Sequence, residues 1–331
     1  MNKVILLHSR PTGKPTLSNF EFVDQSIPVA ADGELLLKAC YVSVDPYLRG
    51  RMNDAKSYTP PFELNKPIQS AIVAEVVESN LAGYQKGDFV MGYLEWKQFQ
   101  TSSGKGLMKV DPKQAPLSYY IGILGLTGLT AYLGLTDIGM PKEGETLVVS
   151  CAAGAVGSVV GQIGKLLGCH VVGIAGSDEK VELLKNSFGF DAGINYKTTP
   201  NMYKAIQAAC PNGVDVYFDN VGGEISDAVL GNINKHARII ICGAISLYNA
   251  TEQPMGPRLQ PILLVKSATM RGFIVSDYYK SFPEGVKQLA TWLQEGKLKN
   301  VETIVEGFDQ IPQAFLDLFE GKNEGKMIVK V

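Results

Sequence analysis

The stretch from Thr146 to Lys180 decides the fold, and it reads TLVVSCAAGAVGSVVGQIGKLLGCHVVGIAGSDEK. It opens with the apolar run Leu147-Val148-Val149, which has the length and β-branching of a buried parallel strand. Apolar residues then recur at helical spacing from Val156 to Leu167, and Gly168 ends that pattern. A second apolar run, from His170 to Ala175, has the character of another strand. Together these segments predict one β-α-β unit of roughly 30 residues.

The loop between the first strand and the helix carries Gly154 and Gly157, spaced as Gly-x-x-Gly. Gly154 would let the backbone approach a pyrophosphate, while Gly157 and Gly161 would let the helix lie close against its strand. The unpaired N–H groups and the dipole at the helix start favour a bound phosphate. The first position of the usual Gly-x-Gly-x-x-Gly pattern is not glycine here, and paired glycines also occur in structural turns. The placement between a strand and an amphipathic helix is what predicts a dinucleotide site.

The end of the second strand helps to choose the cofactor. An NAD site usually has Asp or Glu there, about 20 residues beyond the glycines, to hold the ribose 2′-hydroxyl. Here the strand runs into Gly176 and Ser177, followed by Asp178 and then Lys180. A small hydroxyl residue with a nearby cation suits a 2′-phosphate. Ser177 also reads as a helix N-cap with Asp178 and Glu179 in the first turn, and the two roles are compatible. The pattern favours NADPH over NADH.

Length and charge limit the class of protein. The chain has 331 residues, which suits two domains with a substantial core. Lys and Arg total 31 against 33 Asp and Glu, so neither a nucleic acid nor a membrane is expected as a partner. No apolar run reaches transmembrane length, and the first residues lack the long apolar segment of a signal peptide. We therefore expect a cytoplasmic protein.

Cysteine and histidine spacing argues against a disulfide scaffold or a metal site. No two cysteines have CxxC spacing, and most lie in apolar runs, so we expect free buried thiols. A catalytic zinc needs Cys and His ligands with an open position, and no such set is close in the sequence. The residues concerned are Cys40, Cys151, Cys169, Cys210 and Cys242, with His8, His170 and His236.

The rest of the chain divides by pattern. Residues 1 to about 120 are β-rich, with strands predicted over 3–7, 34–39, 70–77 and 89–91. Strands and helices then alternate: a strand over 192–196, a helix over 202–209, a strand over 214–219, a helix over 224–233, and strands over 237–243 and 270–275. A helix over 283–295 precedes strands over 303–305 and 327–331, which flank a helix over 310–319 and are expected to rejoin the front part.

These patterns predict an α/β fold with two parts. Alternating strands and helices imply a Rossmann-type, doubly wound parallel sheet over residues 123–296, with ligands at the carboxyl edge of its strands. Residues 1–122 and 297–331 would form a β-rich, partly open barrel. Within that barrel, residues 44–52 and 58–62 depart from strand patterning and are rich in Tyr, Arg and Met. Such a loop could form a pocket wall, although Arg49 and Arg51 could equally be surface or ion-pair residues.

Several collinear motifs resemble the medium-chain dehydrogenase/reductase superfamily, and within it the zinc-independent leukotriene dehydrogenase and prostaglandin reductase group. The resemblance implies a GroES-like front domain and a homodimer. The matching segments span nearly the whole chain: VDPYLRGRM at 44–52, PKEGETLVV at 141–149, AAGAVG at 152–157, GQIGK at 161–165, NVGG at 220–223, YN at 248–249 and GKN at 321–323.

The resemblance also implies which residues hold NADPH. Those at the pyrophosphate would be Gly154, Ala155, Val156 and Gly157, and those at the adenosine 2′-phosphate would be Gly176, Ser177, Lys180 and Tyr196. The nicotinamide half would be lined by Thr127, Asn220, Cys242, Gly243, Ala244, Phe273, Ile274, Val275 and Asn323. Tyr47, Arg51, Tyr58 and Tyr248 would face the substrate. Two positions depart from the group: Cys151 replaces a small residue, and Thr127 replaces proline.

The implied reaction is NADPH-dependent reduction of a carbon–carbon double bond conjugated to a carbonyl, in a small apolar enone or enal. Charge would gather on the carbonyl oxygen, and a donor must stabilise it. The candidate donors are the nicotinamide ribose 2′-hydroxyl and the hydroxyl of Tyr248, the candidate catalytic residue, because a tyrosine with a pKa near roughly 10 keeps its proton at neutral pH. Tyr248 could instead pack for bulk in a turn with Asn249. A quinone oxidoreductase of the same fold and a non-catalytic NADPH-binding protein are the alternative functions.

Overall fold

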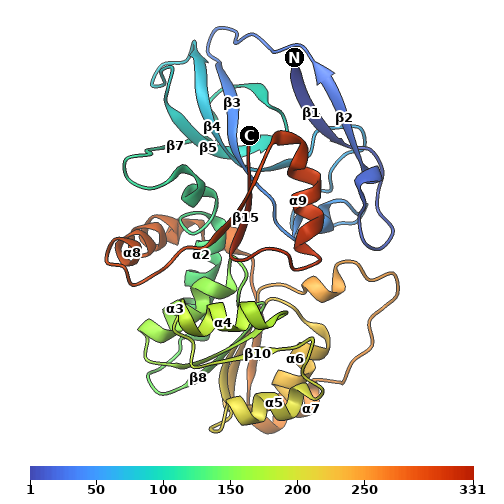
Figure 1. The fold of residues 1–331 in the computed structure, drawn as a ribbon, viewed down its shortest axis with the longest axis vertical. Coiled ribbons are helices and arrows are strands. Elements are labelled where there is room, and N and C mark those ends of the chain that lie inside the picture. The colour runs from blue at the N-terminus through green and yellow to red at the C-terminus, as the bar shows by residue number, and fades with distance from the viewer. The chain divides into compact units, whose positions relative to one another are not determined.

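The computed structural model describes residues 1–331 and divides into two compact units (Figure 1). The first unit contains Met1–Gly122, Thr303–Asn323 and Met327–Val331, and the second contains Ile123–Glu302 and Glu324–Lys326. The predicted domain boundaries, at 1–122 with 297–331 and at 123–296, stay a prediction.

The second unit is built on a six-stranded sheet in the order β10-β9-β8-β11-β12-β13, with every neighbouring pair parallel. The strand order reverses at the β8–β11 pair: β9 and β10 follow β8 on one side, and β12 and β13 follow β11 on the other. This arrangement confirms the predicted doubly wound sheet, whose ligand crevice lies at the carboxyl ends of those two strands. The strands are β8 (Thr146–Ser150), β9 (His170–Ala175), β10 (Ala192–Asn195), β11 (Val214–Asp219), β12 (Ile233–Ile241) and β13 (Thr269–Gly272).

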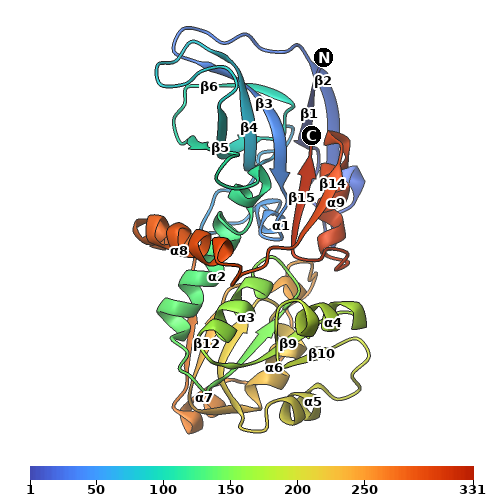
Figure 2. The same ribbon diagram turned by 60° about the vertical axis from the view of Figure 1, so that its left-hand side comes forward.

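Helices cover both faces of this sheet (Figures 1 and 2). α5, α6 and α7 share one core with it, through Ile206, Val229 and Ile262. α3 and α4 contact β8, β9 and β10 from the other side. The helices are α2 (Leu126–Leu133), α3 (Gly157–Leu166), α4 (Asp178–Asn186), α5 (Met202–Ala209), α6 (Gly223–Leu230), α7 (Gln260–Lys266) and α8 (Phe282–Gln294), with a π-helical turn at Gly134–Gly139 and 3-10 turns at Ile245–Leu247 and Val275–Ser281.

Glycines bring α3 close to its neighbours, but not all as expected. A Cβ at Gly161 would lie 1.8 Å from the Phe190 ring, so this glycine makes room for an aromatic side chain rather than for the strand. Gly164 is the glycine that faces β8, where a Cβ would lie 2.5 Å from Leu147. The predicted role of Gly161 in strand packing is therefore corrected, because the helix meets the sheet one turn later, at Gly164.

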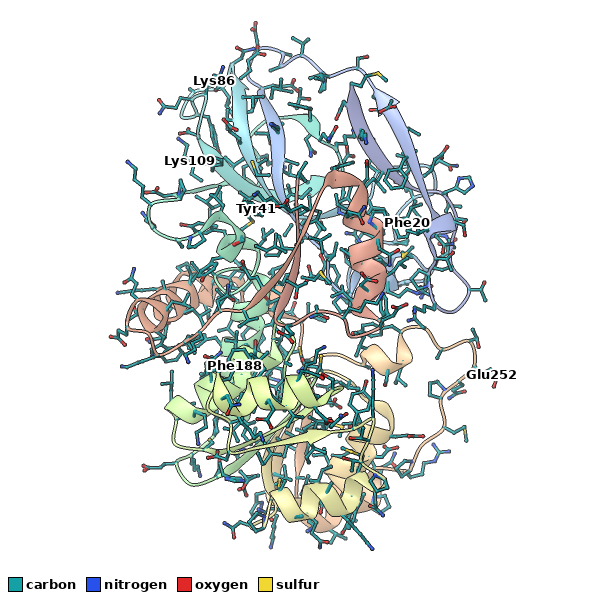
Figure 3. All side chains as sticks on the ribbon, viewed as in Figure 1. Phe20, Tyr41, Lys86, Lys109, Phe188 and Glu252 are labelled. Atoms are coloured by element: carbon teal, nitrogen blue, oxygen red, sulfur yellow. The ribbon has the colours of Figure 1, made fainter.

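The first unit is β-rich, as predicted. Its main sheet has the order β14-β15-β3-β4-β5-β7, with β6 on β3, beside an antiparallel β1-β2 pair. Phe20 packs against Trp96 and Phe315 in its core (Figure 3). The elements are β1 (Asn2–Leu7), β2 (Phe20–Gln25), β3 (Leu35–Ser43), α1 (Leu48–Arg51), β4 (Gln69–Ser79), β5 (Phe89–Glu95), β6 (Phe99–Ser102), β7 (Met108–Val110), β14 (Glu302–Glu306), α9 (Ile311–Leu318) and β15 (Lys326–Lys330), with 3-10 turns at Leu17–Asn19, Leu117–Ile121 and Phe308–Gln310.

Two predicted elements were wrong at their ends. The helix predicted over 224–233 stops at Leu230, and Ile233 instead pairs with Val214 as the first residue of β12. The strand continues through a register shift around His236, which has φ +65°. The predicted strand over 270–275 ends at Gly272, so Phe273 follows it as a loop residue.

The cysteines are all free, but only Cys169 and Cys210 are buried. The prediction of buried thiols is therefore wrong for Cys151, which is exposed, and only partly right for Cys40 and Cys242. No helix has both the length and the apolar character needed to cross a membrane.

Candidate active site

The loop after β8 is shaped for close approach of a ligand to its backbone. A Cβ at Gly157 would lie 2.4 Å from the Cys151 carbonyl oxygen, and one at Gly154 would lie 3.0 Å from Cys151 Sγ. A side chain at either glycine would collide with the loop or fill it. α3 starts at Gly157 with no side-chain cap, and the Ser158 and Val159 N–H groups bond to the Gly154 and Val156 carbonyls at 3.0 and 3.1 Å, so an anion would be met by the loop N–H groups before them. The loop residues Ala155 and Val156 therefore fit the expected pyrophosphate cradle.

A second glycine segment lies against this loop. Gly325, with φ +61°, donates its N–H to the Ala153 carbonyl at 2.8 Å and forms a β-bridge with Gly154. A Cβ at Gly325 would lie 1.8 Å from the Val301 carbonyl oxygen, so only glycine fits there. Asn323 belongs to the first unit, two residues earlier in the chain.

The end of β9 gathers the residues expected at the 2′-phosphate. Ser177 has extended backbone and caps α4, because its Oγ accepts the Lys180 N–H at 3.3 Å. The predicted N-cap is therefore confirmed. A Cβ at Gly176 would lie 3.1 Å from the Tyr196 ring and 3.4 Å from Lys197 Cε, so both side chains lie over this glycine.

Two lysines lie at this strand end, together with the acids Asp178 and Glu179 in the first turn of α4. Burial lowers the pKa of Lys180, and the like charge of Lys197 acts in the same direction. Asp178, the first residue of α4, accepts a hydrogen bond from Asn195 Nδ2 at 2.7 Å. Sequence reasoning missed Lys197; a lysine directly after the predicted Tyr196 was the available signal.

The carboxyl ends of β8, β11 and β12 are joined by hydrogen bonds. Asn220 donates its N–H to Ser150 Oγ at 2.9 Å and its Nδ2 to the Ser150 carbonyl at 2.8 Å. The N–H groups of Cys242 and Gly243 donate to the Asp219 carbonyl at 2.8 and 3.1 Å. The structure thus brings Asn220, Cys242 and Gly243 to one edge, as expected, and adds Ser150 and Asp219, which the sequence did not single out.

Tyr248 lies just beyond this edge, after the 3-10 turn Ile245–Leu247. Its side chain is half-buried, and its hydroxyl accepts the Ala244 N–H at 3.3 Å. A Cβ at Gly243 would lie 3.2 Å from the same hydroxyl. Burial raises the pKa of Tyr248 above its ordinary value, so the phenol stays protonated at neutral pH. A hydroxyl that accepts one bond and keeps its proton can donate another.

Phe273 is placed differently from the other edge residues. Its ring packs edge-on against Phe218 and Tyr278, with centroids 6.5 and 6.1 Å away. A Cβ at Gly134 would lie 2.6 Å from it, so the ring is held in a tight apolar site. The Phe273 side chain therefore has a packing role. A ligand at this loop could contact the backbone of Phe273, Ile274 and Val275 instead. Thr127 lies on α2.

The loop rich in Tyr and Arg, at residues 44–52 and 58–62, belongs to the first unit, and its two arginines have different contacts. Arg49 is buried and donates to Asn53 Oδ1 at 2.6 Å and to the Gly13 carbonyl at 2.8 Å, which is a structural role. Arg51 donates from Nε to the Pro60 carbonyl at 3.0 Å, and its guanidinium lies 4.0 Å from the Phe62 ring centroid.

The two tyrosines of this loop differ in exposure. The Tyr47 hydroxyl contacts the Tyr93 hydroxyl, and Tyr47 is half-buried directly before α1. Tyr58 is 60% exposed and lies between α1 and β4. The Tyr47 side chain is therefore held by a contact with Tyr93, whereas the Tyr58 side chain is mostly exposed to solvent.

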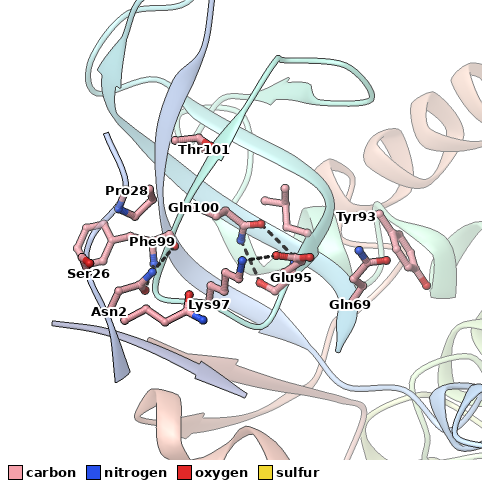
Figure 4. Close-up of a pocket in the computed structure, with 12 residues that line it drawn as sticks. Asn2, Ser26, Pro28, Gln69, Tyr93, Glu95, Lys97, Phe99, Gln100 and Thr101 are labelled. Atoms are coloured by element: carbon pink, nitrogen blue, oxygen red, sulfur yellow. Dashed lines mark hydrogen bonds and ion pairs between the residues drawn. The ribbon is translucent and has the colours of Figure 1, made fainter. Parts of the chain in front are cut away.

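A hollow of about 420 Å³ also lies in the first unit (Figure 4). Its polar side chains bond to one another: Lys97 pairs with Glu95 at 2.6 Å, and Gln100 Nε2 donates to the Glu95 carbonyl at 3.0 Å. No predicted site residue lines it. No group of three or more His, Cys, Asp or Glu side chains in the structure could hold a metal ion.

Comparison with known proteins identifies the family. Residues 3–110 match a family model described as the N-terminal domain of oxidoreductase, and residues 155–292 match one described as zinc-binding dehydrogenase. The chain is 57% identical over 329 residues to YfmJ of Bacillus subtilis, provisionally named an NADP-dependent oxidoreductase, covering 99% of this chain and 97% of the relative. It is 43% identical over 335 residues to the NADPH-dependent curcumin reductase of Escherichia coli, covering 100% and 97%.

A solved structure agrees over the whole length. The crystal structure of CurA from Vibrio vulnificus in complex with NADPH has a TM-score of 0.95 and 44% identity, covering 99% of each chain. The fold, the glycine loop and these similarities lead to one assignment. The chain belongs to the medium-chain dehydrogenase/reductase family, in the NADP-dependent prostaglandin reductase and curcumin reductase group.

Proposed function

We propose that this protein uses NADPH to reduce the carbon–carbon double bond of small apolar α,β-unsaturated ketones and aldehydes. The observation that carries the proposal is the state of the Tyr248 hydroxyl. It accepts the Ala244 N–H at 3.3 Å at the carboxyl end of β12, and its raised pKa keeps its own proton available for a substrate oxygen. That is the donor which this reaction needs.

The cofactor would lie along the carboxyl edge of the six-stranded sheet, and when bound it supplies the hydride. We assign the pyrophosphate to the loop at Gly154 and the start of α3, where a Cβ would obstruct the backbone. We assign the 2′-phosphate to Ser177, Lys180 and Tyr196. A phosphate there would meet the Lys180 cation, the Ser177 hydroxyl and the Tyr196 ring, while Asp178 on the same turn is engaged by Asn195.

Tyr248 would act on the substrate's carbonyl oxygen. Addition of hydride at the β-carbon moves an electron pair toward that oxygen and makes an enolate. A neutral phenol aimed at the oxygen stabilises the developing charge without losing its proton, in the manner of an oxyanion hole. The α-carbon then takes a proton from water, which completes the saturated ketone or aldehyde. Tyr47 is the proposed aromatic contact in the first unit, since its ring is anchored through the Tyr93 hydroxyl.

The test follows NADPH oxidation with ethyl propenyl ketone, crotonaldehyde and duroquinone in parallel. We expect turnover of the ketone or aldehyde, and a loss of about 100-fold in kcat in the Tyr248→Phe variant. Tyr279→Phe is the matched control, because Tyr279 is 63% exposed in the same unit. Turnover of the quinone alone would favour a quinone oxidoreductase. Tight NADPH binding with no turnover of any acceptor would favour a non-catalytic protein.

We also propose a homodimer. β13 is the outer strand of the six-stranded sheet, and such an edge readily pairs with another chain. Directly before it, α7 exposes Leu264 and Val265 by 80% and 75%, which supports an apolar contact there. Light scattering on the purified protein tests this, and a monomer mass would contradict it.

A further inference from the structure

We infer that Asp219 is a positioning residue that holds Tyr248 in place for the proposed reaction. The inference rests on the proposed function of Tyr248. Asp219 is the last residue of β11 and is 2% exposed. It lies at the carboxyl end of the strand where the sheet order reverses, which is the floor of the ligand crevice. A buried carboxylate at such a place needs several donors to be stable.

One oxygen of this carboxylate receives four donors. Ser150 Oγ lies 3.1 Å from Asp219 Oδ1, and the Tyr217 hydroxyl lies 2.9 Å from it. The backbone N–H groups of Val221 and Gly222 each donate to the same oxygen at 2.9 Å. Because charge-assisted hydrogen bonds are roughly twice as strong as neutral ones, this carboxylate fixes the tight turn between β11 and α6.

Carbonyl groups of that turn accept the hydrogen bonds that hold the segment carrying Tyr248. The Asn220 carbonyl accepts the Ile245 N–H at 3.3 Å. The Val221 carbonyl accepts the Ser246 N–H at 3.1 Å and the Ser246 hydroxyl at 2.6 Å. These three bonds end two or three residues before Tyr248, so the position of the turn sets the position of the phenol.

Close packing makes this relation sensitive to small shifts. A Cβ at Gly222 would lie 3.3 Å from Ala244 Cβ, and one at Gly223 would lie 3.0 Å from Ser246 Oγ. The turn and the Tyr248 segment therefore approach as closely as glycine allows. A displacement of the turn must pass to Ala244, whose N–H bonds the Tyr248 hydroxyl.

The experiment is a double-mutant cycle of Asp219→Asn with Tyr248→Phe, using the full chain and ethyl propenyl ketone. The amide keeps the shape but loses the charge that holds four donors. We expect Tyr248→Phe to lower kcat about 100-fold in the wild type and less than about 5-fold in Asp219→Asn, because a displaced phenol contributes little. NADPH affinity should change by less than about 3-fold in Asp219→Asn, measured by fluorescence titration.

The matched control is Asp215→Asn, at the amino end of the same strand. Asp215 also joins neighbouring strands, since it accepts the Thr146 N–H at 2.9 Å and Asn234 Nδ2 at 2.8 Å. It should lower stability yet leave the full effect of Tyr248→Phe. Hydrogen exchange in the cofactor-free protein gives a second readout: Asp219→Asn should speed exchange at residues 221, 222, 245 and 246, and Asp215→Asn should not.

If Asp219→Asn does not fold, Ser246→Ala tests the middle link, because it removes only the 2.6 Å bond from an exposed hydroxyl. It too should weaken the effect of Tyr248→Phe. An undiminished effect of Tyr248→Phe in the Asp219→Asn or Ser246→Ala background would overturn the positioning role while leaving the proposed function intact. If Tyr248→Phe has no effect in the wild type, the proposed role of Tyr248 itself fails.

Discussion

The carboxylate of Asp178 accepts a hydrogen bond from Asn195 Nδ2 at 2.7 Å, across the ends of β9 and β10. In an NAD site an acid near this place holds the ribose hydroxyls, and its free charge would repel a 2′-phosphate. Here the acid is engaged by a neighbouring amide, while Lys180 and Lys197 lie on the same strand end. The geometry of this pair is therefore consistent with selection of NADPH.

Lys180→Ala should weaken NADPH binding and leave NADH binding nearly unchanged. A hydrogen bond to a charged group contributes about 1.5–3 kcal/mol, which corresponds to about 10- to 100-fold in Kd. Fluorescence titration with both nucleotides measures the ratio of the two affinities. Lys185→Ala is the control, because Lys185 is on the same helix but pairs with Glu182 at 2.5 Å. An equal loss for both nucleotides would place Lys180 elsewhere than at the 2′-phosphate.

Cys151 adopts φ +50°, a left-handed conformation that costs a residue with a Cβ about 1–2 kcal/mol. Cys151→Gly should remove that strain and raise the melting temperature by about 2–4 °C, since the backbone entropy of glycine offsets part of the gain. Calorimetry at fixed pH measures it. Cys151→Ala keeps the Cβ and should not stabilise. Equal stabilisation by both variants would mean that the thiol, and not the backbone angle, is responsible.

Local periodicity was sufficient for most of the second unit. The strands at His170–Ala175 and Val214–Asp219 and the helix Met202–Ala209 match their predictions, because each repeats apolar residues at its own period. β12 was misread at its start because Ile233 is flanked by polar residues and by Gly231, directly after a helix; pairing of Ile233 with Val214 makes this segment a strand. Tertiary pairing likewise makes strands of β2, β6 and β7, which have no strong pattern.

The site residues likewise divide into those that a local sequence pattern can reveal and those that depend on tertiary contacts. The glycine loop and the Ser177 cap lie within one stretch, so spacing alone could reveal them. Asp219 was missed because its donor Ser150 is 69 residues away in the sequence. Such a bond exists only once the parallel strands are adjacent, and no local pattern encodes it.

Arg49 and Arg51 should differ sharply when each is replaced by methionine. Arg49 is 3% exposed and joins α1 to the loop at Gly13, so its loss leaves buried carbonyls without a donor. We expect Arg49→Met to lower the free energy of unfolding by about 2–4 kcal/mol. Arg51→Met should cost less, because it removes one bond to Pro60 and retains apolar contact with Phe62. Urea denaturation followed by tryptophan fluorescence compares them, and equal losses would refute the distinction.

Glu145 and Arg238 predict a pH dependence of stability. Burial alone would raise the pKa of the Glu145 carboxyl, but hydrogen bonds from Arg238 outweigh it and lower that pKa below its usual value. Arg238 Nη1 lies 3.0 Å from Glu145 Oε1, and its Nε donates to the Gly139 carbonyl at 2.8 Å. Since the folded state has the lower pKa, the pair stabilises the protein above the unfolded pKa of about 4.3 and loses that contribution as the pH falls through the folded value.

Glu145→Gln should therefore lower the free energy of unfolding by about 1 kcal/mol at pH 7, and the difference from wild type should narrow as the pH falls below the unfolded pKa. Denaturant melts at several pH values measure this difference. Glu143→Gln controls for the loss of one negative charge, because Glu143 is exposed two residues earlier. A gap between Glu145→Gln and wild type that does not shrink as the pH falls below the unfolded pKa would show that the amide acts by altered packing.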